Sequence, residues 1–159
     1  LELKLTGQQG DVMQESMNVA KTLALNLLSE QEKDILFKNL ENNKFKGIHI
    51  HCPEGAMKKD GPSAGIAITM ALYSLFTNKK IKNNIALTGE INLQGNVTEI
   101  GGLDCKIIGG IKAGVKHFIY PKSNSKDFND FKEKYKTKKL ENIKFNEVSN
   151  VYNVIDLIF

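Results

Sequence analysis

The pattern of apolar and polar residues changes its period several times along the chain, and each period predicts one type of secondary structure. Apolar residues spaced three and four apart predict amphipathic helices, whereas short apolar or alternating runs predict strands. Helical spacing covers residues 11–28, 103–114, 127–135 and 150–159, and strand patterns cover residues 1–5, 48–52, 85–88, 97–100, 115–120 and 143–148. Because helices and strands alternate, we expect one compact, layered, mixed α/β domain over residues 1–159.

Two segments depart from these patterns. Residues 64–76 are apolar on nearly every side, which predicts a buried helix. Residues 29–46 are polar, charged and rich in Asn, and they predict either a short surface helix or an extended loop. Asp11 and Ser125 are of a residue type that often caps helices, so we expect each to be an N-cap.

The tripeptide Gly61-Pro62-Ser63 lies directly before the predicted buried helix. Proline fixes φ and glycine allows conformations that other residues avoid, so the chain is expected to bend sharply here. Ser63 then has two interpretations. As an N-cap it satisfies the helix start, and because such serines are common, the tripeptide alone favours this role. As a nucleophile it would use the free N–H groups of the helix start to hold an oxyanion.

Lys106 falls within an apolar helical stripe, unlike most lysines of this chain. Desolvation disfavours the charged form of a lysine, so burial there would favour the uncharged amine that a general base needs. The alternative is that the side chain extends to water while its stem covers apolar surface. The glycine pair at 109–110 in the same helix predicts close backbone packing, and we expect its neighbour to be the helix that follows Ser63.

Other residues with reactive side chains give weaker signals. His49 and His51 lie on one face of a predicted strand, but a metal site needs further ligands, so we expect packed or water-facing side chains. Cys52 and Cys105 are the only cysteines, which argues against a disulfide scaffold and indicates a reducing compartment. No run approaches the roughly 18 apolar residues of a membrane span.

The formal net charge of +4 raises the question of an acidic partner. Every basic residue is lysine, and the chain contains no arginine. Since arginine supplies the planar donor fork favoured in phosphate and base recognition, its absence argues against binding of nucleic acid through this domain. We interpret the charge as a solvated surface.

Several short motifs follow one another along the first 121 residues, and together they resemble the signature of the proteolytic domain of Lon proteases, the ATP-dependent serine–lysine peptidases. Residues 122–159 are much less distinctive. The matching motifs are Thr6-Gly7, Gly10-Asp11-Val12-Met13-Gln14-Glu15-Ser16, His49-Ile50-His51-Cys52-Pro53-Glu54-Gly55, Lys59-Asp60-Gly61-Pro62-Ser63-Ala64-Gly65, Thr88-Gly89-Glu90-Ile91, Gly95, and Ile100-Gly101-Gly102-Leu103 followed by Lys106.

This resemblance implies the α/β fold of Lon proteolytic domains and a catalytic dyad of Ser63 and Lys106. Their separation of 43 residues is the spacing expected in the family. Ser63 would be the nucleophile and Lys106 the general base. Thr88 matches a hydroxyl residue of the family pattern, and we expect it to hydrogen-bond the lysine. We expect Asp60 and Glu54 to shape the loop rather than to take part in catalysis.

The resemblance also implies features that lie outside this chain. No phosphate-binding Gly-x-x-x-x-Gly-Lys-Ser/Thr motif is present, so we expect no cofactor in this domain, with ATP and Mg bound by an ATPase module elsewhere in the polypeptide. The chain begins at Leu1 rather than Met, and we expect a piece of a longer protein. The family implies a homohexameric ring that degrades unfolded or misfolded polypeptides in protein quality control.

Three alternatives stay open at this point. The domain could be a catalytically silent Lon-like assembly domain, or a basic nucleic-acid-binding module with the same fold. A third alternative is a serine peptidase whose base is His49 or His51 instead of Lys106. Cysteine usage and a lysine-, asparagine- and isoleucine-rich composition suit the mitochondrial matrix or, alternatively, the bacterial cytoplasm.

Overall fold

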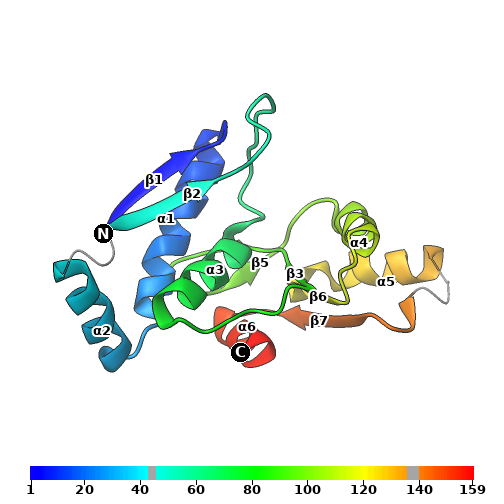
Figure 1. Ribbon diagram of the computed structural model, residues 1–159. Coiled ribbons are helices and arrows are strands. Elements are labelled where there is room, and N and C mark those ends of the chain that lie inside the picture. Colours follow the sequence, from blue (N-terminus) through cyan, green and yellow to red (C-terminus); the bar gives the residue numbers. More distant parts are fainter. Residues whose placement is uncertain (43–45, 136–139) are drawn as a thin grey trace.

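The computed structural model describes residues 1–42, 46–135 and 140–159. Helices and strands alternate through most of this chain, as the sequence pattern predicts (Figure 1). In order, the elements are β1 (Glu2–Thr6), α1 (Asp11–Asn26), α2 (Glu30–Glu41), β2 (Gly47–His51), α3 (Gly65–Thr77), β3 (Ile85–Leu87), β4 (Glu90–Ile91), β5 (Val97–Thr98), α4 (Leu103–Lys112), β6 (His117–Pro121), a 3-10 turn η1 (Lys122–Asn124), α5 (Ser125–Lys134), β7 (Lys144–Val148) and α6 (Val151–Ile158).

The described strands form three small sheets. β1 pairs in parallel with β2, and β6 pairs in parallel with β3 on one side and β7 on the other. β4 and β5 form an antiparallel hairpin whose turn contains Gly95 at φ 82°. β7 is therefore an edge strand, as expected, and β6 is central and buried at every position. The mixed α/β prediction is confirmed.

Helices α1 and α3 pack side by side and form the centre of the molecule (Figure 1). Their facing side chains are fully buried, including Ala20 of α1 and Ile66 and Met70 of α3. Helix α6 closes this core with Val151 and Val154, which are also fully buried. A second apolar cluster lies between α4, α5 and the β3–β6–β7 sheet. The start of α3 lies between these two clusters, with α1 on one side and α4 on the other.

The helix termini differ from the predictions at two places. Asp11 and Ser125 are the first residues of α1 and α5 rather than N-caps, and the caps are Gly10 and Asn124. The segment after α1, for which a helix or a loop was expected, forms helix α2. Its N-cap Ser29 accepts a hydrogen bond from the Glu32 N–H while the Glu32 carboxylate accepts one from the Ser29 N–H, which satisfies two free donors of the helix start.

Candidate active site

The sharp bend before α3 is present at Gly61, whose φ is 107°, a left-handed conformation that favours glycine. Helix α3 begins at Gly65, and its N-cap is Ala64, which offers no side-chain hydrogen bond. The N-cap interpretation of Ser63 is therefore wrong. Ser63 lies one residue before the cap, half-buried, with its hydroxyl free for another partner.

The main chain around Ser63 is held by hydrogen bonds from two directions. The Ser63 carbonyl accepts from the Gly89 N–H at 2.9 Å and from Thr88 Oγ1 at 3.2 Å. On the other side, Ser16 Oγ of α1 donates to the Pro62 carbonyl at 3.3 Å. The prediction that Thr88 hydrogen-bonds Lys106 is wrong, because its hydroxyl donates to the Ser63 carbonyl instead. These bonds fix the position from which the serine side chain projects.

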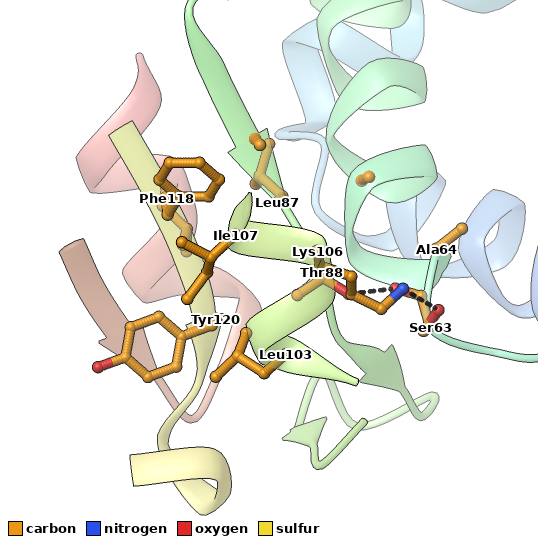
Figure 2. Close-up of a pocket in the computed structure, with 12 residues that line it drawn as sticks. Ser63, Ala64, Leu87, Thr88, Leu103, Lys106, Ile107, Phe118 and Tyr120 are labelled. Carbon is orange, nitrogen blue, oxygen red and sulfur yellow. Dashed lines mark hydrogen bonds between the residues drawn. The ribbon is translucent and has the colours of Figure 1, made fainter. Parts of the chain in front are cut away.

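Lys106 lies on α4 and reaches across to the serine. Its Nζ donates a hydrogen bond to Ser63 Oγ at 3.2 Å (Figure 2). Helix α4 starts after Gly102, whose φ of 69° redirects the chain, and Lys106 lies one turn into the helix. The structure thus brings together the two residues that the sequence singles out, although they are 43 positions apart.

The surroundings of Lys106 differ from the prediction. Its neighbours in the apolar stripe, Leu103 and Ile107, are buried, but Lys106 itself is exposed. The expected burial of Lys106 is wrong, because the side chain leaves the helix at the margin of the stripe. The glycine pair also packs differently: a side chain at Gly110 would meet the Phe118 ring of β6 at 2.5 Å, while Gly109 faces open space. The Phe118 ring of the sheet, and not α3, is therefore the close neighbour of Gly110.

An apolar cavity of about 200 Å³ lies beside the serine and lysine. We refer to it as the apolar cavity; Ser63 and Lys106 are at one end, and Leu87, Leu103 and Phe118 are among its walls (Figure 2). Tyr120 also lines it, and burial, helped by the Glu147 carboxylate, raises the pKa of Tyr120 to about 12. The apolar lining makes the cavity suited to an apolar group.

Backbone donors lie close to the serine hydroxyl. Within the described part of the chain, the N–H groups of Ser63 and Ala64 have no hydrogen-bond acceptor, whereas Gly65 donates to Pro62 and Ile66 to Gly89. Free N–H groups at a helix start are suited to stabilising negative charge. The turn can therefore supply donors to an oxyanion that forms at Ser63 Oγ.

Asp60 and Glu54 both shape the loop before Ser63, as predicted. The Asp60 carboxylate accepts hydrogen bonds from the N–H groups of Gly61 and Met13, and these bonds lower the pKa of Asp60. It thereby caps α1 from another segment, a role that no local pattern in the sequence showed. The Glu54 carbonyl accepts from the ammonium of Lys59, which also binds the carbonyls of Gly7 and Met57.

The histidines and cysteines lie apart from this chemistry. His49 and His51 share one face of β2, and both bind Thr6 Oγ1 at 2.8 Å. Cys105 is exposed beside Lys106, and Cys52 is half-buried. Across residues 1–42, 46–135 and 140–159, no group of three His, Cys, Asp or Glu side chains could hold a metal ion. In the same residues, no helix is long and apolar enough to cross a membrane.

A hydrogen-bonded serine and lysine, free backbone donors and an adjacent cavity on a mixed α/β domain define a site suited to serine hydrolases. Comparison with known families agrees: residues 1–159 match the model of the Lon protease (S16) C-terminal proteolytic domain. The chain belongs to this family of proteolytic domains.

Individual relatives support the same assignment. The chain is 45% identical over 157 residues to a Lon protease of Borrelia duttonii and 42% identical over 158 residues to one of Parabacteroides distasonis, covering 99% and 98% of this chain. It is 47% identical over 128 residues, 80% of this chain, to the mitochondrial Lon protease homolog of Drosophila melanogaster. The match spans 18%, 18% and 12% of these relatives, so most of each relative lies outside the matched region.

Proposed function

We propose that this chain is a serine endopeptidase domain in which Ser63 is the nucleophile and Lys106 the general base. The observation that carries the proposal is the 3.2 Å contact between Lys106 Nζ and Ser63 Oγ at the mouth of the apolar cavity. A serine hydroxyl is a weak nucleophile until an adjacent base accepts its proton. No other nitrogen base forms a hydrogen bond with Ser63 Oγ in the described residues, and both β2 histidines bind Thr6 instead.

The reaction follows from these positions. The uncharged amine of Lys106 takes the proton of Ser63 Oγ as the oxygen attacks the peptide carbonyl, and the N–H groups of Ser63 and Ala64 stabilise the oxyanion. The C–N bond then breaks, and the Lys106 ammonium gives its proton to the departing amine, which leaves an acyl-serine ester. A water molecule, deprotonated by Lys106, attacks this ester; the C–O bond to Ser63 then breaks, Lys106 returns the proton to Ser63 Oγ, and the carboxyl product leaves.

The exposed position of Lys106 gives the substrate a part in forming the site. In the chain alone, water reaches Lys106. A polypeptide lying over Ser63 and filling the apolar cavity would exclude water from the reacting groups.

The wider activity rests on the relatives, which are named Lon protease. We propose that this single proteolytic domain acts beside an ATPase module in a longer polypeptide, where ATP and Mg would bind, and that it assembles as a hexamer. Its substrates would be unfolded or misfolded polypeptides. Bacterial and mitochondrial relatives both occur, which supports either a mitochondrial matrix or a bacterial cytoplasmic location.

A serine-directed fluorophosphonate probe tests the dyad. We expect labelling of the wild type, none of Ser63→Ala, and strongly slowed labelling of Lys106→Ala. Lys112→Ala is the matched control, because Lys112 is an exposed lysine of the same helix outside the cavity. Equal labelling of Lys106→Ala and wild type would contradict lysine as the base, and dependence on His51 instead would support a serine–histidine enzyme.

A second measurement addresses the other functional classes. We expect cleavage of unstructured peptides that depends on Ser63 and Lys106. Absence of both cleavage and labelling in the wild type would support a silent assembly domain. Salt-sensitive binding of nucleic acid without peptide cleavage would support a basic binding module.

A further inference from the structure

A second hollow lies on the opposite side of the Ser63 turn from the apolar cavity. It is a groove of about 380 Å³ between α1 and the β4–β5 hairpin, and it extends to Pro62. The apolar cavity begins at Ser63 and Ala64 and extends toward α4. The groove reaches Pro62 and the apolar cavity begins at the next residue, Ser63, so the two hollows adjoin at this turn. In the ribbon, α1 and α4 lie on opposite sides of the start of α3 (Figure 1).

The groove is partly apolar and carries negative charge. Val12 and Leu93 are 48% and 55% exposed on its walls. The exposed carboxylates of Glu15 and Glu90 also line it, and no lysine does, although the chain as a whole has a net charge of +4. Within the described residues, neither carboxylate forms an ion pair or a hydrogen bond.

A polypeptide substrate is long enough to extend beyond Ser63 into neighbouring hollows. An extended chain advances about 3.3 Å per residue, so a substrate with one carbonyl at Ser63 Oγ continues past the serine in both directions. On one side, a side chain can enter the apolar cavity. On the other side, the groove that begins at Pro62 is the adjoining hollow that the chain could enter.

We propose that this groove binds the substrate segment on the far side of the scissile bond from the residue held in the apolar cavity. Its carboxylates would select lysine or arginine in that segment, and Val12 and Leu93 would contact the apolar part of the same side chains. This inference rests on the proposed peptidase function and adds a charge preference to it. Glu15 and Glu90 are specificity-determining residues in this assignment.

A set of internally quenched peptides tests the assignment. All share one apolar residue for the cavity, and each carries Lys, Ala or Glu at a single position on one side of the scissile bond. We expect wild-type kcat/KM to be about three- to tenfold higher for Lys than for Glu at one or two positions on one side only, the size expected of exposed charge pairs. Raising the salt concentration should reduce this ratio.

Variants identify the groove as the source of the preference. Glu15→Gln and Glu90→Gln should each lower the Lys-to-Glu ratio, and the double variant should bring it close to one. Glu133→Gln is the matched control, because it removes one exposed carboxylate from α5, outside the groove. The control should keep the wild-type ratio.

Several results would overturn the inference. A ratio near one at every position in the wild type, or a ratio unchanged in the double variant, would remove the groove from substrate binding. A double variant that alters sedimentation of the protein but not the charge preference would make the groove an interface between copies. Serine-dependent cleavage without charge preference contradicts this inference alone, whereas cleavage that survives Ser63→Ala contradicts the proposed function as well.

Discussion

The serine and the lysine of the candidate site are held in different ways. The main chain at Ser63 is fixed by Thr88 and Gly89 on one side and, through Pro62, by Ser16 on the other. Lys106 extends from an exposed part of α4, and the contact of its amine with Ser63 is its one side-chain hydrogen bond in the described residues. The serine is thus positioned by several main-chain hydrogen bonds, whereas the lysine is held at the site by a single side-chain hydrogen bond within the described residues.

Removing either member of the pair is the strongest way to test this comparison. Ser63→Ala should reduce peptide cleavage to background, and Lys106→Ala should lower kcat/KM by about a hundredfold or more, the usual effect of losing a general base. Cleavage assays with Lys112→Ala as the control measure both. Lys106→Ala activity close to that of wild type would show that the contact is not catalytic.

Alanine substitutions at two neighbouring glycines test how closely α4 packs against the sheet. Gly110→Ala places a methyl group 2.5 Å from the Phe118 ring, so we expect a destabilisation of about 1–3 kcal/mol from overpacking. Gly109→Ala meets open space and should stabilise the helix by up to about 1 kcal/mol. Urea unfolding of the two variants measures the difference. Equal effects would mean that the approach of α4 to β6 does not constrain the lysine's helix.

Substitutions at Thr88 test the hydrogen bond that its hydroxyl donates to the Ser63 carbonyl. Thr88→Val removes the hydrogen bond to the Ser63 carbonyl and keeps the shape, at a cost of about 0.5–1.5 kcal/mol. We expect a several-fold decrease in kcat with little change in KM, and rescue by Thr88→Ser. If Thr88→Ser behaves like Thr88→Val, the methyl group rather than the hydroxyl matters.

The smallest effect is expected at Asp60, and it depends on pH. Two backbone hydrogen bonds lower the pKa of Asp60 in the folded state, so its carboxylate contributes stability above the ordinary aspartate pKa of about 4. That contribution is lost as the pH falls through the lowered pKa. Asp60→Asn should therefore be less stable than wild type at pH 7, and the two proteins should converge in strong acid. A difference independent of pH in urea unfolding would contradict this role.

Much of the fold could be predicted from the sequence because its signals are local. Alternating apolar and polar residues predicted β1, β2 and β7, and apolar residues spaced three and four apart predicted α1, α4 and α6. Helix α2 stayed open between helix and loop because its apolar side is thin, although Ser29 followed by Glu32 carries a capping signal that would have decided it. The parallel pairings, of β1 with β2 and of β6 with β3 and β7, depend on contacts between distant segments, and no local pattern encodes them.

In the candidate site too, some features could be predicted from local sequence signals and others depend on contacts between distant segments. The motif that contains Ser63 and the spacing to Lys106 identified the pair, and the structure brings the two side chains together. The partner of Thr88, the capping of α1 by Asp60 and the exposure of Lys106 were not predictable in this way. Each depends on the orientation of a side chain relative to a segment more than 20 residues away, which is decided by packing.

The order of the strands in the three-stranded sheet has a consequence for how the protein is made. Thr88 and Gly89, which hydrogen-bond the Ser63 carbonyl, directly follow β3. The Thr88 N–H in turn donates to the Ile119 carbonyl of β6. β6 in turn pairs with β7 near the end of the chain. A nascent chain that has left the ribosome only as far as Lys106 carries both reactive side chains but lacks the strands that orient them. The candidate serine and lysine would therefore stay unassembled until β6 and β7 have also been synthesised.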